Sequence, residues 1–362
     1  MDPSPSPIEA VSQRLESFVA DRVAETRDAG ADALDFVHAA ASVLDGGKRL
    51  RARFCLTGWQ SVAGRRTGDG DPGTAVISAA AALEVFHAAA LVHDDLIDNS
   101  DTRRGRPAAH RALEAHHGAS GWSGRAETFG RSAAILLGDL LVAWSDDLLE
   151  EGLRDAAHAA PARATFALMR REVTIGQYLD IAEEASFVTA PDAEHADRAL
   201  RVASLKSARY SIQHPLLLGA TLAGADDAQL AALAAFGHPL GLAFQLRDDV
   251  LGVFGDSAVT GKPSGDDLRE GKRTVLVAYT RTALAPGARR LFDEMLGDPG
   301  LDAAQVAFLQ ETIRDTGALD RVEALISDYA GEADRALRGA PLDTHAVGTL
   351  RDLARDATAR AS

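Results

Sequence analysis

Apolar and charged residues alternate with helical spacing along most of the chain. Over residues 8–44 they recur every three to four positions, as on amphipathic helices, whereas residues 75–98 are almost wholly apolar before an acidic end. A run that is hydrophobic on all sides predicts a helix buried in a core. Further helices are predicted over 131–152, 161–187, 192–223, 227–254 and 274–285, with an amphipathic tail from 287 onward.

Two glycine-rich stretches interrupt the helical pattern. They cover residues 64–74 and 116–127 and have the composition of loops. The chain shows no internal repeat and no alternation of strands with helices, so it predicts an all-α fold with a buried central bundle. Since no linker marks a boundary, we expect one domain over residues 9–362, after a disordered lead of proline and serine over residues 1–8.

Composition narrows the possible functions. Aromatic residues make up only 5% of the chain, which favours helices over strands, and the net charge of −15 argues against non-specific binding of nucleic acid. Cys55 is the single cysteine, so no intramolecular disulfide can form, which fits a reducing cytoplasm. No signal peptide is predicted, and no uninterrupted apolar run reaches the roughly 20 residues of a membrane span.

Three aspartates stand together at the end of the long apolar segment, in "HDDLIDNSDTRRGRP". Asp94 and Asp98 lie four residues apart, and Asp95 and Asp98 three apart, so a helix brings all three carboxylates together at its end. Their mutual repulsion and loss of hydration favour a bound divalent cation. Mg²⁺ takes oxygen ligands and commonly joins one or two carboxylates to substrate phosphates. For one such cluster alone, a solvated acidic helix end is the alternative.

A second apolar helix ends in the same way. It carries Asp248 and Asp249, with Gln245 one turn earlier. Two such clusters in one chain favour two acidic sites that face one cavity over two solvated helix ends. Asp146 and Asp147 form another acidic pair, but they occupy amphipathic positions with no basic cluster after them, so we expect them on the surface.

Basic residues cluster near both acidic helices. Arginine can bind a diphosphate through two hydrogen bonds, and a flexible glycine pair precedes the first cluster. The candidate phosphate-binding residues are Lys48, Arg49, Arg51 and Arg53 in "GGKRLRAR", Arg103, Arg104 and Arg106 in "TRRGRP", Lys206 beside Ser207, and Lys262 and Lys272 in "TGKPSGDDLREGK". His87 lies two helical turns before Asp94 on the same side of the helix, which makes it a candidate ligand of a second diphosphate.

The order and spacing of these motifs resemble the trans-isoprenyl diphosphate synthases of the polyprenyl synthetase family. The matching elements are "GGKRLR", "FHAAALVHDDLID" with "TRRGRP", "ILLGDLL", "GQYLD", "LKSARYS", and "FQLRDDVLGVFGD" with "TGKPSGDDLREGKRT". The resemblance implies an isoprenoid synthase-type helical bundle around a central active-site cavity, usually in a homodimer. It also implies head-to-tail prenyl transfer from an allylic diphosphate to isopentenyl diphosphate, with three Mg²⁺ ions per active site.

The same resemblance implies roles for individual residues. Mg²⁺ would be held by Asp94, Asp95, Asp98, Asp248 and Asp249, with Gln177 and Asp180 in support. The allylic diphosphate would be bound by Arg103, Lys206, Ser207, Gln245, Lys262 and Lys272, and isopentenyl diphosphate by Lys48, Arg51, His87 and Arg104. Among the cations, Arg103 and Lys206 would act in catalysis with the aspartates, because they neutralise the leaving diphosphate.

The second acidic motif departs from the family pattern. The family commonly has a third aspartate at the position where this chain has Gly252. Asp248 and Asp249 are the expected direct ligands of the metal, so activity is expected to persist. The missing third aspartate is expected to change the metal affinity or the reaction rate. Asp256, a little further along, is a candidate for partial compensation.

Small residues before the first aspartates bear on product length. The growing hydrocarbon is expected to run back along the apolar helix, where Ala89 and Ala90 are too small to block it and Phe86 is the first bulky side chain. This favours geranylgeranyl diphosphate as product, with a longer chain (C25 or more) or farnesyl diphosphate as alternatives. A class I terpene cyclase would need no second diphosphate site, and a non-catalytic partner subunit would be expected to lose acids from the metal sites.

Overall fold

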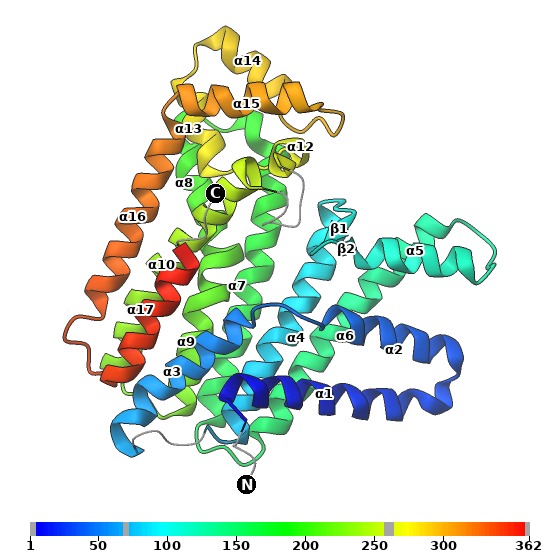
Figure 1. The fold of residues 1–362 in the computed structure, drawn as a ribbon, viewed down its shortest axis with the longest axis vertical. Helices are drawn as coiled ribbons and strands as arrows, with labels where there is room; N and C mark the ends of the chain where they lie inside the picture. The colour runs from blue at the N-terminus through cyan, green and yellow to red at the C-terminus, as the bar shows by residue number, and fades with distance from the viewer. Residues whose placement is uncertain (1–4, 68–71, 257–263, 359–362) are drawn as a thin grey trace. The chain divides into compact units, whose positions relative to one another are not determined.

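The computed structural model describes residues 5–67, 72–256 and 264–358, and the described elements are almost all helical (Figure 1). The chain divides into two compact units, Met1–Ala162 with Leu218–Ala225, and Arg163–Leu217 with Asp226–Ser362. The predicted all-α class is confirmed, whereas the single domain over residues 9–362 stays a prediction.

The described elements follow the predicted order of helices. Those of the first unit are α1 Pro7–Thr26, η1 Arg27–Ala29, α2 Ala31–Val43, α3 Leu50–Thr67, α4 Thr74–Ile97, β1 Thr102–Arg103, β2 Arg106–Pro107, α5 Ala109–Ala119 and α6 Ala126–Leu153. Those that lie wholly or mainly in the second unit are α7 Ala159–Ser186, η2 Phe187–Thr189, η3 Asp192–Glu194, α8 His195–Val202, η4 Ala203–Gln213, α10 Asp227–Phe254, α12 Asp266–Glu270, α13 Val275–Ala283, α14 Pro286–Met295, α15 Ala303–Asp315, α16 Ala318–Ala336 and α17 Thr344–Thr358. Helix α9, His214–Leu222, belongs partly to each unit.

Several predicted boundaries are wrong by a few residues. Helix α1 begins at Pro7, inside the predicted disordered lead, because Ser6 caps it: the Ser6 hydroxyl accepts from the Glu9 amide, and Glu9 accepts from the Ser6 amide. The loop predicted from residue 64 starts too early, since α3 continues to Thr67. Capping and tertiary packing extend both helices past the point where the hydrophobic pattern fades.

Helix α4 forms the core of the first unit. Every residue from Val76 to Phe86 is buried, and α4 runs alongside α6 (Figure 1). Of the helices in the described ranges, it alone is long and apolar enough to cross a membrane, but 78% of its most apolar window lies inside the protein. Such burial is typical of the core helix of a globular protein.

A glycine in the "ILLGDLL" motif allows α4 and α6 to approach closely. A β-carbon added to Gly138 would lie 2.1 Å from His93 Nε2, well inside any real contact distance. The same His93 nitrogen lies 3.3 Å from the carbonyl oxygen of Ile135, one turn earlier on α6. Gly138 therefore provides the space in which the imidazole reaches the backbone of α6.

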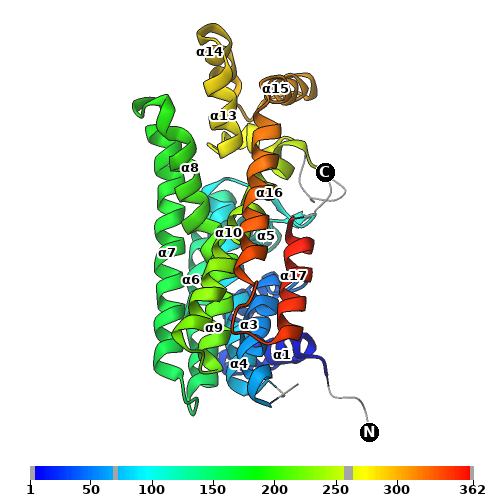
Figure 2. The same cartoon turned by 90° about the vertical axis from the view of Figure 1, so that its left-hand side faces the viewer.

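In the second unit, α10 packs against α16 and against η4, and α13, α14 and α15 gather at one end of α16 (Figure 2). The helix predicted over 192–223 is not regular, because η4 is a π-helix. The backbone of η4 packs closely against glycines of two neighbouring helices. A β-carbon added to Gly241 of α10 would lie 2.4 Å from the backbone oxygen of Ala208, and one added to Gly176 of α7 would lie 2.3 Å from the backbone nitrogen of Lys206. Such π-helices occur often at functional sites.

We expect Gly138→Ala to lower the free energy of unfolding by about 1–3 kcal/mol, because the new methyl group forces His93 and α6 apart. Chemical denaturation followed by circular dichroism measures this. Gly118→Ala in α5 is the matched control, since nothing lies within 4 Å of its added β-carbon. Equal stabilities for the two variants would contradict the close approach at Gly138.

Candidate active site

The first acidic cluster lies at the C-terminal end of α4. Asp94 and Asp95 lie in its last turn. The backbone amide of Asp98 caps the helix by donating to the backbone carbonyl oxygen of Asp94 at 2.8 Å. Asp95 is only 3% exposed. The Arg103 guanidinium donates from Nε to Asp95 Oδ1 at 2.9 Å and also contacts Asp94 at 3.7 Å. The structure therefore brings Arg103 together with Asp94 and Asp95.

A two-stranded hairpin carries the arginines that follow. Strands β1 and β2 pair so that Arg103 faces Arg106, with Arg104 and Gly105 as the two-residue loop. Both loop residues have positive φ, +53° at Arg104 and +72° at Gly105, as in the type I′ turns that favour tight hairpins. Arg104 is in a left-handed conformation that is uncommon outside glycine, and such backbone strain concentrates at functional sites.

The glycine pair of "GGKRLR" forms a tight turn against this hairpin. Gly46 and Gly47 have φ of +74° and +86°, and a β-carbon on Gly47 would lie 3.1 Å from the Arg104 guanidinium. The turn also holds Arg49 with a φ of +50°. The positive φ favours glycine at Gly47, and the absence of a β-carbon leaves room for the Arg104 guanidinium.

A buried acid stabilises these cations. Glu84 on α4 is 6% exposed, accepts a hydrogen bond from the Ala52 amide at 3.0 Å, and lies 3.9 Å from Arg49 Nη1. Desolvation lowers the pKa of Arg104, and Glu84 counteracts this. Sequence reasoning missed Glu84, although it is the one acid of α4 before the aspartates and lies one turn from His87.

The imidazole of His87 is surrounded by positive charge. Glu84, His87, Arg49 and Arg104 line one small pocket of the first unit. Desolvation, and then Arg51 and Arg104, lower the pKa of His87 well below its usual value. The imidazole is therefore neutral near pH 7 and can donate a hydrogen bond to an anion without carrying charge.

A cavity of about 680 Å³ lies among α2, α4, α5 and α6 of the first unit. On α4 it is lined by Ala88, Leu91, Val92 and Asp95, and its polar lining includes Arg103, Arg104 and Arg106. The residues proposed from the sequence to control product length are not in this lining. Phe86 and Ala89 are buried, at 6% and 0% exposure, and Ala90 is partly buried.

The second acidic cluster lies near the end of α10. Asp249 is 8% exposed, and Gln245 Nε2 donates to its Oδ1 at 2.7 Å. Burial raises the pKa of Asp249 to about 8, with further contributions from Asp267 and Asp248, while Gln245 and Lys272 oppose the shift. Asp248, the other predicted ligand, is partly buried. A carboxylate in these surroundings is stabilised by a nearby cation.

The π-helix η4 brings Lys206 to α7. Its ammonium donates to Asp180 Oδ2 at 2.5 Å, which joins the "LKSARYS" and "GQYLD" motifs of the second unit. Ser207 is the next residue of η4, and Gln177 lies one turn before Asp180; both are partly buried. The structure therefore pairs two of the residues singled out from these motifs.

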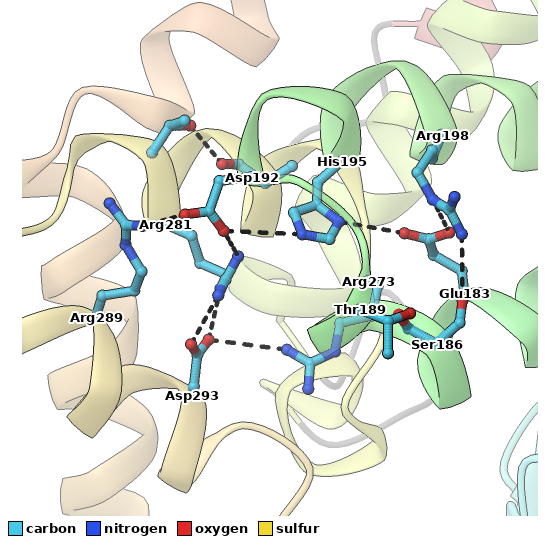
Figure 3. A network of polar contacts seen from close by, with 12 residues as sticks. Glu183, Ser186, Thr189, Asp192, His195, Arg198, Arg273, Arg281, Arg289 and Asp293 are labelled. Carbon is cyan, nitrogen blue, oxygen red and sulfur yellow. Dashed lines mark hydrogen bonds and ion pairs between the residues drawn. The ribbon is translucent and has the colours of Figure 1, made fainter. Parts of the chain in front are cut away.

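Lys272 follows α12 and lies 2.9 Å from Glu270. Its neighbour Arg273 is held by a polar network that Figure 3 shows. The Arg273 guanidinium lies 4.1 Å from the centre of the Phe187 ring, and Arg281 lies 4.3 Å from the same centre. Arg281 donates to both oxygens of Asp293, at 2.6 and 2.9 Å. These contacts hold the side chain of Arg273, the residue after Lys272. Lys262, which was predicted to bind the allylic diphosphate together with Lys272, lies outside the described residues.

Further members of the network lie behind Phe187. The His195 ring stacks on Phe187 at 3.9 Å, and its Nδ1 lies 3.3 Å from Glu183. Asp192 accepts from Arg281 at 3.0 Å (Figure 3). Nothing in the sequence motifs pointed to these residues, because their contacts join five separate helical segments.

Two acids outside the clusters are near or on the surface. Asp147 has a side-chain exposure of 54% and lies 3.9 Å from Arg22, as expected for a surface residue, and Asp146 is partly exposed. Asp256, considered as a substitute for the acid missing at residue 252, is exposed just beyond the end of α10.

The predicted ligands of both clusters fit magnesium. They offer carboxylate oxygens only, as a hard divalent cation prefers. Within the described parts of the chain, no three acid, histidine or cysteine side chains already form a metal cluster. The protein would therefore supply single or paired carboxylates and leave other coordination positions to water and phosphate, which is the usual way in which Mg²⁺ is bound.

An all-helical fold, in which an apolar core helix ends in aspartates beside an arginine hairpin, defines the trans-prenyltransferase class of enzyme. A family model described as polyprenyl synthetase matches residues 36–313. The chain belongs to the polyprenyl synthetase family.

Individual relatives differ in the product that they are named for. A geranylgeranyl diphosphate synthase of Mycobacterium tuberculosis is 37% identical over 245 residues, which is 68% of this chain and 61% of that protein. A geranylfarnesyl diphosphate synthase of Aeropyrum pernix is 32% identical over 82% of this chain and 84% of its own. The crystal structure of the geranylgeranyl pyrophosphate synthase from Corynebacterium glutamicum, complexed with isoprenyl diphosphate and magnesium, superposes with a TM-score of 0.91 at 40% identity and covers 98% of both chains.

We expect Glu84→Gln to lower stability by about 1–3 kcal/mol, because it leaves Arg49 and Arg104 without their buried counter-charge. Inorganic diphosphate should raise the Tm of this variant more than that of the wild type, because the added anion replaces the lost charge. Differential scanning fluorimetry with and without diphosphate measures this, with exposed Glu16→Gln as control. The same diphosphate-induced rise in all three proteins would exclude this role of Glu84.

Proposed function

We propose that the protein catalyses the Mg²⁺-dependent, head-to-tail condensation of isopentenyl diphosphate with an allylic diphosphate, with geranylgeranyl diphosphate as the main product. The observation that carries the proposal is the end of α4, where buried Asp95 is joined by Arg103 from the hairpin that also presents Arg104. The names of two of the relatives and the ligands of the Corynebacterium structure support the choice of substrates, metal and product.

Each unit is assigned its own residues for the allylic diphosphate. In the first unit, Asp94, Asp95 and Asp98 would hold Mg²⁺ beside Arg103. In the second unit, Asp248 and Asp249 would hold Mg²⁺, with Gln177 and Asp180 in support, and the family resemblance implies three ions in all. The phosphate oxygens would be bound by Arg103 of the first unit and by Lys206, Ser207, Gln245, Lys262 and Lys272 of the second. When bound, Mg²⁺ stabilises the negative charge that develops on the leaving diphosphate. Arg103 and Lys206 add charge-assisted hydrogen bonds to the same group, so the allylic carbon–oxygen bond breaks with its electron pair on the diphosphate.

The proposed site for isopentenyl diphosphate consists of Lys48, Arg51, His87 and Arg104. The strained, glycine-supported turn and hairpin hold Arg104 in place before substrate binds, which reduces the entropy lost on binding. Neutral His87 donates a hydrogen bond without adding to the repulsion among the arginines. Arg49 with Glu84 completes this cationic surface, and we assign to this pair a positioning role.

Carbon–carbon bond formation then needs no side-chain nucleophile. The alkene of isopentenyl diphosphate attacks the allylic carbocation, and a proton leaves the new cation for the departing diphosphate. Apolar helix walls protect the carbocation from water.

A homodimer is proposed from the family resemblance. The side chains of Ile135 and Leu136 on α6 are 49% and 60% exposed and offer apolar surface for a second copy. The single cysteine is consistent with a cytoplasmic location.

Purified protein with MgCl₂, isopentenyl diphosphate and farnesyl diphosphate should yield a C20 prenyl diphosphate, and chelation of Mg²⁺ should stop the reaction. Asp95→Asn should lower kcat at least about hundredfold, whereas Asp147→Asn should not. Chromatography of radiolabelled products, with geranyl and dimethylallyl diphosphates as further primers, measures this. A hydrocarbon formed without isopentenyl diphosphate would indicate a class I terpene cyclase, and no product would indicate a non-catalytic subunit. Nothing beyond C15 would refute the product assignment.

From the sequence pattern we propose that the growing chain follows the face of α4 that carries Ala89 and Ala90, with Phe86 beyond them. This face differs from the one that lines the 680 Å³ cavity with Ala88, Leu91 and Val92. On this proposal, Phe86→Ala should shift the products toward longer chains. Ala89→Phe should have the opposite effect and shorten the product. Both are measured by product chromatography at matched extents of conversion. An unchanged chain-length distribution in both variants would remove this face of α4 from the control of product length.

A further inference from the structure

Lys272 lies on a short bridge between two capped helices of the second unit. Gly271, with a left-handed φ of +78°, caps the end of α12, and the Gly271 and Lys272 amides both donate to the backbone oxygen of Asp267 at 3.1 Å. Helix α13 begins after Thr274, whose side chain caps its first turn. Lys272 and Arg273 are therefore the two residues between the caps, and the contacts of Arg273 bear on where Lys272 stands.

The guanidinium of Arg273 is largely buried and lies against an aromatic ring. Its side chain is 17% exposed, and its Cζ lies 4.1 Å from the centre of the Phe187 ring. Asp293 Oδ1 lies 4.0 Å from Arg273 Nη1, which is longer than a hydrogen bond, whereas Arg281 donates to both Asp293 oxygens at 2.6 and 2.9 Å. Desolvation lowers the pKa of Arg273, and Asp293 opposes this shift. The ring is therefore a principal contact of the Arg273 cation, because the attraction of a cation to an aromatic face grows where water is excluded.

The ring of Phe187 is itself held in place from α7 and α8. Phe187 and His195 are each 3% exposed, and their rings stack with centres 3.9 Å apart and an angle of 24° between their planes. His195 Nδ1 lies 3.3 Å from Glu183 of α7, and Arg198 Nε donates to the same carboxylate at 2.6 Å (Figure 3). A chain of contacts thus runs from α7 through two stacked rings to Arg273.

The charge of Lys272 acts on the second acidic cluster. Its ammonium lies 2.9 Å from Glu270 and opposes the rise in the pKa of buried Asp249. A lysine attracts phosphate as a point charge, so its contribution depends on its distance from the phosphate oxygens. A shift of the bridge between α12 and α13 would therefore weaken the attraction of Lys272 for a bound diphosphate.

We infer that Phe187 is a positioning residue: its ring holds Arg273, and through Arg273 it sets the position of the Lys272 ammonium toward the allylic diphosphate. Phe187 acts through its neighbours and is not itself a phosphate ligand. The inference rests on the proposed function and deepens it, because it adds a residue from outside the sequence motifs to the diphosphate site of the second unit. A side chain that is already buried and stacked can hold a cation with little further loss of conformational entropy.

Calorimetric titration of the protein with inorganic diphosphate and MgCl₂ measures anion binding without turnover. All variants carry Arg51→Gln, which weakens the anion site proposed for the first unit. Phe187→Leu should raise the Kd for diphosphate about threefold to tenfold, as expected for the loss of one desolvated cation–π contact. Tyr279→Leu is the matched control and should leave the Kd unchanged, because it removes a different cation–π contact of the second unit, with Arg321 at 3.7 Å.

A double-mutant cycle separates the positioning of Lys272 from a structural role. Because Phe187 acts through Lys272, Phe187→Leu should have little further effect once Lys272→Ala has removed the ammonium. A general weakening of the fold would instead raise the Kd by the same factor in both backgrounds. Arg273→Gln, which leaves the Phe187 ring in the core, should give the same cycle with Lys272→Ala. Circular dichroism checks that each variant is folded.

Four results would overturn the inference. They are an unchanged Kd for diphosphate in both Phe187→Leu and Arg273→Gln, equal factors with and without Lys272, an unchanged Kd in Lys272→Ala, and no diphosphate binding by the Arg51→Gln background protein. Because no prenyl substrate is present, these results stay separate from the prenyl-transfer assay. A wild-type protein that forms no product would defeat the proposed function, whereas a normal prenyltransferase in which the effects of Phe187→Leu and Lys272→Ala are additive would defeat only the role of Phe187.

Discussion

Negative charge at buried helix ends is the constraint on which both acidic clusters depend. Asp95 and Asp249 are 3% and 8% exposed, so neither carboxylate is fully hydrated. A carboxylate in such surroundings either gains a proton or gains a cation. At Asp95 the guanidinium of Arg103 fills this role, while at Asp249 burial and neighbouring acids raise the pKa to about 8. The need for positive charge at these two positions makes them suited to a divalent cation and a diphosphate.

The remaining features of the site bring cations to defined places. The Arg104–Gly105 loop, the Gly46–Gly47 turn and the π-helix at Lys206 each depart from regular backbone, and each presents a basic side chain. A residue such as Arg104 in the left-handed region costs of order 1 kcal/mol, which the surrounding core has to offset. Glycines where segments touch, as at Gly47 and Gly176, allow the close approach on which these places depend. Rigid backbone thus positions flexible charged side chains before any substrate arrives.

Much of the fold and part of the site can be predicted from the sequence. The period of apolar residues identified α4 and α10, and the spacing of Asp94, Asp95 and Asp98 placed three acids at the end of one helix, although no three acid side chains of the described residues form a metal cluster. These are local properties, because the geometry of a helix determines which nearby residues share a face. The pairing of Lys206 with Asp180, and of Glu84 with Arg49, could not be predicted in this way. Each pair joins segments that are far apart in the sequence, and only packing decides which charges meet.

The relation between Gly252 and Asp267 shows the same limit. By itself, the sequence determined the all-α class, the motifs that resemble the polyprenyl synthetase family, and the absence of an acid at residue 252. Only the tertiary structure decided that the Asp267 carboxylate lies where a side chain at residue 252 would begin, since this depends on Leu268 packing into the core with residues of α10. Helical periodicity is set by bonds between near neighbours, whereas a binding site is set by contacts between segments that the core brings together.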